Sequence, residues 1–147
     1  MDFRTETSLG YVVNHFARLM ARDLEARIKP HGMALGAFPA LLHLWEKDGL
    51  TQKELVAKLG IEQPTLAATL TRMERDGLVT RQRDAGDGRV QRIRLTDKAR
   101  ALRELAYAEA TAVNARAVAG LTEAEQQQLL TLMGRVISSL ETTPGSD

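Results

Sequence analysis

The 147-residue sequence contains no cysteine, few aromatic side chains (4%) and no long hydrophobic run. The lack of cysteine excludes disulfides, thiolate zinc sites, catalytic thiols and cysteine-based redox sensing. No stretch approaches the roughly 18 apolar residues that a membrane span needs. No apolar run follows a basic patch near Met1, so the sequence predicts a cytoplasmic protein without a targeting segment.

The chain also has almost no net charge, because 20 Lys and Arg residues are balanced by 19 Asp and Glu residues. These charges are unevenly distributed. Residues 79–100 carry seven basic and three acidic side chains, whereas residues 101–147 carry three basic and six acidic ones. Positive charge is therefore concentrated in one short segment, where it can attract a polyanion.

Apolar side chains at three- and four-residue spacing predict two amphipathic helices in the first third of the chain. The first extends from Ser8 to Lys29, and the second begins at Phe38 and ends before Gly49. Pro39 falls in the first turn of the second helix, where proline is tolerated.

A pair of short helices follows. Thr51 and Glu54 have the spacing of a capping box, which predicts a helix that Gly60 ends. Pro64 is well placed in the first turn of the next helix, which stops near Gly77. Two short helices joined by a tight, glycine-containing turn are typical of a helix-turn-helix unit.

Residues 78–95 have the β-like runs and the glycine-rich centre of a hairpin with a long tip. Thr96 then caps a long, alanine-rich helix that Gly120 breaks. A second capping box, Thr122 with Glu125, starts the last helix. The apolar stripe of that helix consists of Leu129, Leu130, Met133, Val136, Ile137 and Leu140.

The arginine-rich hairpin is open to two interpretations. Taken alone, it is equally well read as a solvated surface. Directly after a helix-turn-helix, however, it matches a winged DNA reader, in which a helix enters the major groove and the wing reaches the backbone and the minor groove. We therefore expect this segment to bind DNA.

The same segment resembles the MarR family of transcriptional regulators, and within that family the SlyA branch. The similarity covers roughly residues 50–100 and is most specific at the wing tip, where Asp-x-Arg is followed six residues later by Leu-Thr. The residues that carry the resemblance are Ile61–Leu66, Leu70, Glu74–Val79, Asp84, Asp87–Arg89 and Leu95–Ala99.

The resemblance implies a single MarR-type domain with a mainly α (α+β) fold. A winged helix-turn-helix lobe over residues 35–96 is flanked by dimerisation helices over residues 8–34 and 97–141, and a disordered tail covers 142–147. It also implies a homodimer that reads a pseudo-palindromic operator in double-stranded DNA. The apolar stripes of the first and last helices independently require a partner surface; the alternative is that they close a bundle within one chain.

On the second helix of the helix-turn-helix, the resemblance assigns DNA contacts to the exposed start and to positions one and two turns further on. The residues are Gln63, Pro64, Thr65, Thr69 and Arg72. An arginine at this place can pair with guanine O6 and N7, whereas Thr69 could instead be a solvent-exposed spacer. Ala68 departs from the SlyA pattern, which commonly has arginine there, and offers only a methyl contact.

On the wing, Arg89 matches the arginine that enters the minor groove, with Asp87 holding its guanidinium by a charge-assisted bond. The alternative for Asp87 is a plain turn former. Arg83 is a further DNA-binding candidate. From the sequence alone, each of the other hairpin arginines could contact the DNA backbone or form a salt bridge within the subunit. These arginines are Arg81, Arg83, Arg92 and Arg94.

Many members of the family respond to small phenolic or aromatic acids that bind between the dimerisation helices and the winged lobe. The corresponding candidates here are Tyr11, His15, Arg18, Phe38, Trp45 and Tyr107. His15 or Arg18 could pair with a carboxylate of an aromatic acid or of an acyl-CoA thioester. Phe16 on the first helix belongs to the same aromatic set. For Phe16, Phe38 and Trp45 the alternative is core packing, because all three occupy apolar stripe positions.

We expect no cofactor, no metal site and no enzymatic activity. The three histidines, His15, His31 and His43, match no short metal-binding motif, and the chain has no hydrolase or phosphate-binding motif. The prediction is therefore a DNA-binding regulator, a repressor by family habit, that a ligand releases. The alternative is an architectural or counter-silencing DNA-binding protein that no ligand controls.

Overall fold

The structure is a computed structural model that describes residues 1–142 and 144. The predicted tail at 142–147 thus lies mostly outside the described residues. The α-helices and strands follow in the order α1 (Leu9–Ile28), α2 (Phe38–Glu46), α3 (Gln52–Leu59), α4 (Gln63–Arg75), β1 (Val79–Arg83), β2 (Gln91–Leu95), α5 (Asp97–Ala117) and α6 (Glu123–Glu141). Short 3-10 turns cover Thr5–Thr7, Lys29–His31 and Leu35–Ala37. The predicted mainly helical winged fold is confirmed.

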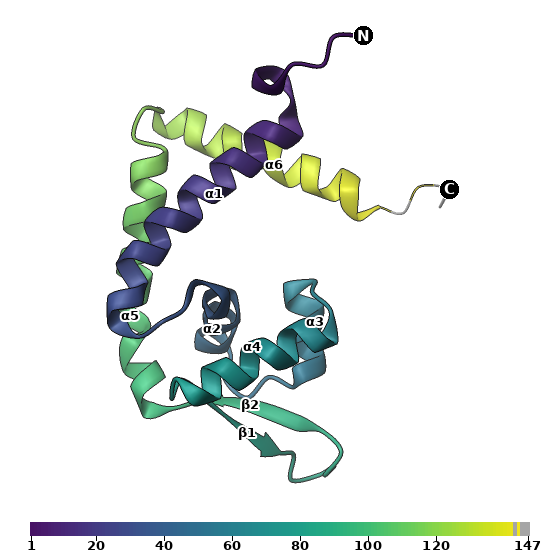
Figure 1. The fold of residues 1–147 in the computed structure, drawn as a ribbon, viewed down its shortest axis with the longest axis vertical. Helices are drawn as coiled ribbons and strands as arrows, with labels where there is room; N and C mark the ends of the chain where they lie inside the picture. Colours follow the sequence, from purple (N-terminus) through teal and green to yellow (C-terminus); the bar gives the residue numbers. More distant parts are fainter. Residues whose placement is uncertain (143, 145–147) are drawn as a thin grey trace.

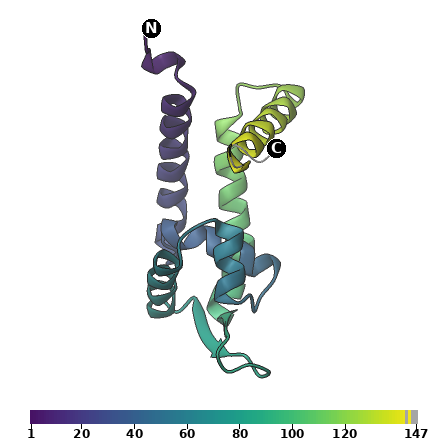
Figure 2. The same ribbon diagram turned by 90° about the vertical axis from the view of Figure 1, so that its right-hand side faces the viewer.

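The chain divides into a compact lobe and a set of long helices that extend from it (Figure 1). Helices α2, α3 and α4 and the antiparallel hairpin of β1 and β2 form the lobe. Helices α1 and α5 pack along each other and carry the chain away from the lobe, and α6 lies at the end opposite the hairpin (Figure 2). None of the described helices is long and apolar enough to cross a membrane.

The hydrophobic core lies in the lobe, where the apolar sides of α2, α3 and α4 meet the inner side of the hairpin. Its fully buried side chains include Leu41, Leu44, Leu55, Leu66, Leu70, Met73 and Ile93. Ile28 and Met33 are also buried in this core, although the sequence assigned both to the dimerisation segment. The end of α1 therefore anchors the long helices to the lobe.

Threonine caps set the starts of three helices, as predicted. The Oγ1 atoms of Thr51, Thr96 and Thr122 each accept a hydrogen bond from the backbone N–H three residues later. The return bond of a capping box forms from Glu125 to the Thr122 N–H (2.9 Å). Among the described residues Glu54 makes no such return bond, so the capping box predicted at Thr51 forms only in part. Helix α5 also ends at Ala117, before the predicted break at Gly120.

An aromatic cluster joins α2 to α5. The Trp45 ring packs edge-on against Phe38 (6.1 Å between centroids) and against Tyr107 (5.8 Å). Its Nε1–H donates a hydrogen bond to the backbone oxygen of Ala99 (2.9 Å), so the one polar atom of the indole is satisfied. These contacts fix the lobe to the N-terminal half of α5.

Helix α6 and most of α1 leave their apolar sides exposed. No residue of α6 is buried by the described chain. The exposed apolar side chains of the two helices are Leu9, Tyr11, Val12, Val13, Phe16, Leu19, Leu129, Leu130, Leu132, Val136, Ile137 and Leu140. The described chain does not close these stripes into a bundle, so the intrachain alternative is wrong for this arrangement.

Candidate nucleic-acid interface and effector cavity

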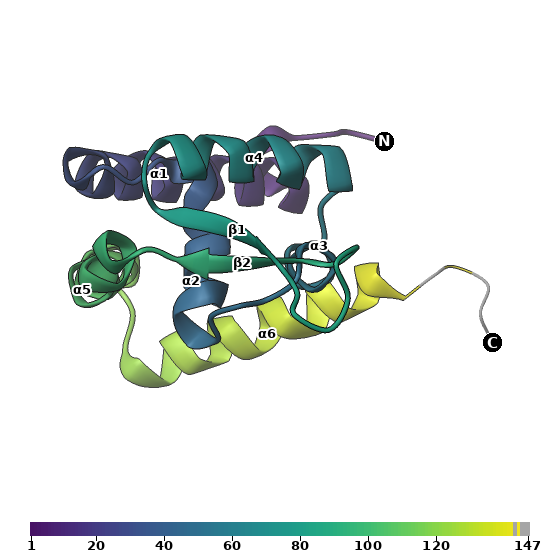
Figure 3. The same cartoon turned by 90° about the horizontal axis from the view of Figure 1, so that it is seen from below.

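In Figure 3, which views the molecule from below, α4 and the hairpin lie toward the viewer. One side of α4 is exposed to solvent. Gln63, Pro64 and Thr65 are exposed at its start, and Ala68 and Arg72 continue the exposed side. The Nε2 atom of Gln52 on α3 donates to the Gln63 Oε1 (3.2 Å) and so holds the first side chain of the helix in place. This side is free to approach a partner along two helical turns.

Thr69 does not lie on that exposed side. It is only 8% exposed, its Oγ1 donates to the Thr65 backbone oxygen (3.1 Å), and it accepts a hydrogen bond from Arg72 (3.3 Å). The 3.6-residue period places position 69 with the buried residues Leu66 and Met73. Both predictions for Thr69, a groove contact and an exposed spacer, are corrected by this burial.

The strand register divides the hairpin arginines between two faces. Arg81 pairs with Ile93, Gln82 with Arg92 and Thr80 with Arg94, so Arg81 and Arg83 share one face and Arg92 and Arg94 share the other. Side chains alternate between the two faces along each strand, so the register assigns every hairpin arginine to one face, which the sequence alone left open.

Each face has one arginine that is committed to its own chain. Arg81 pairs with Glu74 (3.0 Å) and donates to the Ala67 backbone oxygen (2.9 Å), which ties β1 to α4. Arg92 binds Asp84 and a backbone oxygen beyond the hairpin. The side chains of Arg83 and Arg94 are exposed and form no ion pair or hydrogen bond with residues 1–142 or 144.

The wing tip is folded around two carboxylates. Asp84 Oδ2 accepts hydrogen bonds from the backbone N–H groups of Gly86 (3.0 Å) and Asp87 (3.1 Å). Asp87 Oδ1 accepts from the backbone N–H (3.0 Å) and the side-chain Nε (3.3 Å) of Arg89. The Arg89 side chain is 94% exposed, so it projects from the tip while Asp87 orients its root.

The Asp84 carboxylate gives the wing a pH dependence. The Arg92 side chain, followed by the Gly86 and Asp87 N–H groups, holds the pKa of Asp84 below its ordinary value of 3.8. A lowered pKa in the folded state means that the charged carboxylate stabilises the wing fully above the ordinary value and loses this effect as pH falls through the lowered one. We expect wing order to be unchanged from neutral pH to about pH 4.

NMR titration of the Asp84 carboxyl and of the Arg92 Nε–H signal measures this directly. Both signals should change together at a pH below the ordinary aspartate value, and Asp84→Asn should remove the acid-induced change in the Arg92 signal. Titration of Asp84 at or above its ordinary pKa would contradict the prediction.

The six predicted effector residues do not form one site. Phe38 and Trp45 are buried in the aromatic cluster with the half-buried Tyr107, as the core alternative holds. Trp45 also borders a shallow hollow of about 370 Å³ with Arg100 and Arg103, which no other predicted effector residue lines. The remaining three, Tyr11, His15 and Arg18, lie on exposed turns of α1 away from the cluster.

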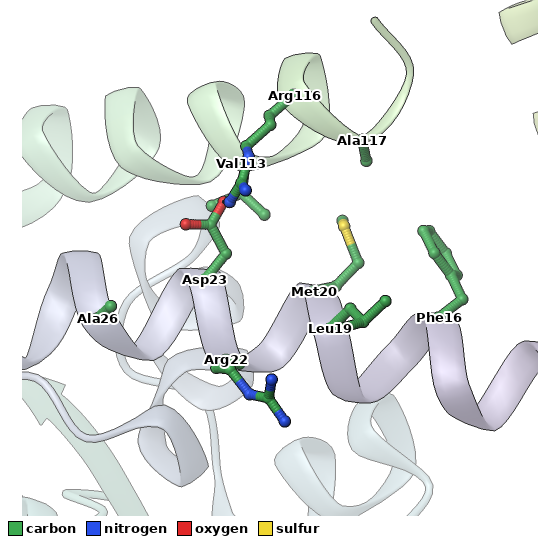
Figure 4. A pocket seen from close by; sticks show the side chains of 9 residues that line it. All are labelled: Phe16, Leu19, Met20, Arg22, Asp23, Ala26, Val113, Arg116 and Ala117. Atoms are coloured by element: carbon green, nitrogen blue, oxygen red, sulfur yellow. The ribbon is translucent and has the colours of Figure 1, made fainter. Parts of the chain in front are cut away.

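A larger cavity of about 530 Å³ lies between α1 and α5 (Figure 4). Its walls are Phe16, Leu19, Met20, Arg22, Asp23, Ala26, Val113, Arg116 and Ala117. In Figure 4, Phe16 and Met20 point from α1 toward α5, whereas Arg22 points away from it. Of these wall residues, Phe16 alone was a candidate from the sequence, where core packing was its alternative; it is 39% exposed and lines the cavity instead.

An ion-pair network spans the space between α1 and α5 at this cavity. Asp23 lies 3.3 Å from Arg116 and 3.2 Å from Arg27, and Arg27 lies 3.4 Å from Glu109, so the network joins α1 to α5. Burial raises the pKa of Asp23, but the Arg116 and Arg27 guanidinium groups outweigh this effect and bring its pKa below the ordinary value. Asp23 is therefore charged at neutral pH.

No group of three or more His, Asp or Glu side chains within residues 1–142 and 144 is arranged to hold a metal ion. His15, His31 and His43 lie on α1, on the turn after it and on α2.

Comparison with known proteins gives consistent matches. A model of the MarR family matches residues 31–90. A MarR family regulator from Listeria monocytogenes, solved in complex with 26mer DNA, is 25% identical over 91% of this chain and 89% of that chain, with a TM-score of 0.83. SlyA is 24% identical over 91% of this chain and 94% of its own, with a TM-score of 0.85, which is a likeness of fold.

Two further matches are structures of proteins named CouR, one bound to DNA and one bound to p-coumaroyl-CoA. The repressor CouR bound to a 23-mer DNA duplex is 27% identical over 93% of this chain and 99% of that chain, with a TM-score of 0.81. CouR from Rhodococcus jostii RHA1 bound to p-coumaroyl-CoA aligns over 99% of this chain and 100% of that chain, at 18% identity and a TM-score of 0.79.

Proposed function

We propose that the chain is a transcriptional regulator of the MarR family, which the family model over residues 31–90 and the similar DNA-bound regulators support. In this proposal it binds a pseudo-palindromic DNA operator as a homodimer and acts as a repressor that a small aromatic acid or its thioester releases. The observation that carries the DNA-binding part is the common face formed by α4 and the hairpin (Figure 3). On this face α4 exposes Thr65, Ala68 and Arg72, and the hairpin that packs against α4 exposes the arginines of the wing.

On this face, α4 and the wing would bind different parts of duplex DNA. The start of α4 has free backbone N–H groups and the positive end of the helix dipole, which favour phosphate. The exposed side of α4 then enters the major groove, while Arg89 reaches the minor groove and Arg83 the backbone. Arg81 and Arg92 are excluded from this role, because their guanidinium groups are held by their own subunit.

The exposed stripes of α1 and α6 support the homodimer. A two-fold partner would cover both stripes and place two lobes at successive turns of the duplex, with recognition helices about 34 Å apart. The segments 8–34 and 97–141 are in this proposal the dimerisation helices, apart from their residues that are buried in the lobe core: Ile28, Met33, Ala99 and Ala106.

Arg72 provides a test of base reading. We expect Arg72→Ala to weaken operator binding by about 1–3 kcal/mol and to relax the preference at one base position of each half-site, because an exposed arginine here can pair with guanine. Fluorescence anisotropy with the operator and with single-base variants measures both effects. Arg75→Ala, one turn further on and 71% exposed, is the matched control. Equal weakening of Arg72→Ala on operator and random DNA would show a phosphate contact only.

The effector is proposed to bind in the cavity between α1 and α5 instead of at the six residues predicted from sequence. Its volume of about 530 Å³ and apolar walls fit a small aromatic ligand, and Arg116 at its rim can pair with a carboxylate. CouR, which binds p-coumaroyl-CoA, has the same fold. A ligand in this cavity releases DNA only if it binds more tightly to a conformation of α1 and α5 in which the spacing of the two lobes does not match the spacing of the DNA half-sites.

Thermal shift screening of aromatic acids and acyl thioesters tests the effector. A true effector should raise the melting temperature and release DNA. Both effects should disappear in Ala117→Phe, which fills the cavity, and persist in Ala108→Phe on the exposed side of the same helix. Broad binding to AT-rich DNA without any ligand response would instead support the architectural alternative.

A further inference from the structure

The base of the wing contains a charge pair that the DNA-reading face does not use. Asp84 Oδ1 lies 2.5 Å from Arg92 Nε, while its other oxygen accepts the two backbone hydrogen bonds that fold the tip. One carboxylate therefore receives three donors, two from inside the loop and one from β2. The loop between the strands is organised around this group.

Arg92 connects the pair to the body of the lobe. Its Nη1 donates to the backbone oxygen of Gly49 (2.9 Å), in the connection between α2 and α3. Gly49 is itself held in place, because its N–H donates to the backbone oxygen of Ile93 (3.1 Å). Its φ of +75° is one that residues with side chains rarely adopt, which favours glycine at this position. A Cβ at this position would also lie 2.5 Å from the Arg94 guanidinium. Through this hydrogen bond Arg92 attaches the wing to the connection between α2 and α3 at Gly49.

We infer that the Asp84, Arg92 and Gly49 clasp positions Arg89 for DNA without touching DNA. This inference rests on the proposed DNA-binding function. The connection is continuous: Gly49 holds Arg92, Arg92 holds Asp84, and Asp84 binds the N–H of Asp87, whose carboxylate orients Arg89. Asp84 and Arg92 are positioning residues.

The clasp explains why a carboxylate lies at the base of a DNA-binding wing. A fixed loop presents Arg89 in one place, whereas a loose loop has to lose conformational freedom when it binds. The sign of one substitution separates this role from simple electrostatics. Asp84→Asn removes a negative charge, which on charge alone would strengthen DNA binding, whereas loss of the clasp weakens it.

A double-mutant cycle tests the inference. Operator affinity is measured by fluorescence anisotropy at constant salt for the wild type, Asp84→Asn, Arg89→Ala and the double variant. We expect Asp84→Asn to weaken binding about tenfold in the wild type and less than about twofold in the Arg89→Ala background, because the clasp acts through Arg89. Asp97→Asn, with the same charge change at an exposed carboxylate outside the wing, should leave affinity nearly unchanged.

Arg92→Lys is the second variant, because it keeps the charge but cannot bridge Asp84 and Gly49 at once. It should weaken binding like Asp84→Asn, and both should retain cooperative thermal unfolding. Equal weakening in both Arg89 backgrounds, or unchanged or tighter binding of Asp84→Asn, would overturn the clasp. If instead Arg89→Ala and the wild type bind operator and random DNA alike, the proposed DNA-binding function fails and not the clasp alone.

Discussion

Replacing Arg89 with alanine is expected to weaken operator binding by on the order of 100-fold or more at moderate salt. Removing the guanidinium from each of the two wings of a dimer should cost about 1–2 kcal/mol of minor-groove binding, and the two effects act on the same complex. The free energy of unfolding should change little, because the side chain is 94% exposed and its ion pair with Asp87 is a surface contact.

The salt dependence distinguishes this interaction from a general effect of charge. Removal of one cation from each wing should reduce the slope of log affinity against log salt by about one for each phosphate that is no longer neutralised. Arg103→Ala is the matched control, because it removes the same charge from an exposed position on α5 outside the wing. Unchanged affinity of Arg89→Ala, or an equal weakening by Arg103→Ala, would remove Arg89 from the DNA interface.

Local signals predicted the helices and their starts well. Thr51, Thr96 and Thr122 cap helices because each hydroxyl satisfies a nearby backbone N–H, and this depends only on neighbouring residues. The burial of Thr69 also follows from periodicity, since it shares a side with Leu66 and Leu70. The family resemblance selected Thr69 for its position along the recognition helix. It did not take into account that this position lies on the buried side of the helix.

The hairpin arginines could not be divided from the sequence. Their division depends on strand register, which is set by a long tip, and on the distant residues Glu74 and Gly49 that receive Arg81 and Arg92. The exposed candidates are therefore identifiable only once the lobe is assembled. Asp84 was likewise visible as a family motif residue, but its connection to the α2 to α3 turn was not.

The effector residues were predicted from the ligand position of the family together with the few aromatic side chains of the chain, and the structure does not bring those residues together. Aromatic side chains are scarce in this chain, so those near each other suggested a ligand site, but Trp45 uses its ring faces and its Nε1–H within the core. The cavity arises instead where α1 and α5, almost a hundred residues apart in sequence, lie side by side, with Ala26 and Ala117 toward its opposite ends (Figure 4). A local sequence pattern cannot predict that these two distant helices pack against each other.

Ile137→Glu is expected to convert the dimer into monomers and to abolish tight operator binding. Ile137 is 52% exposed within its own chain and lies on the apolar stripe of α6, so a glutamate there would put an unpaired charge into the proposed interface. Two-fold symmetry applies this penalty twice. A monomer holds one half-site and forgoes the gain of simultaneous binding, which is about 10²- to 10⁴-fold.

Analytical ultracentrifugation and anisotropy on the same samples measure both effects. Gln128→Glu is the matched control: it adds the same charge to α6, but nine residues from Ile137 it lies on the opposite side of the helix, so it should remain dimeric and bind DNA. The half-site affinity of the monomeric variant should be retained, because the lobe core does not include α6. A dimeric Ile137→Glu protein, or a monomeric wild type that binds the full operator tightly, would show that α6 does not form the interface.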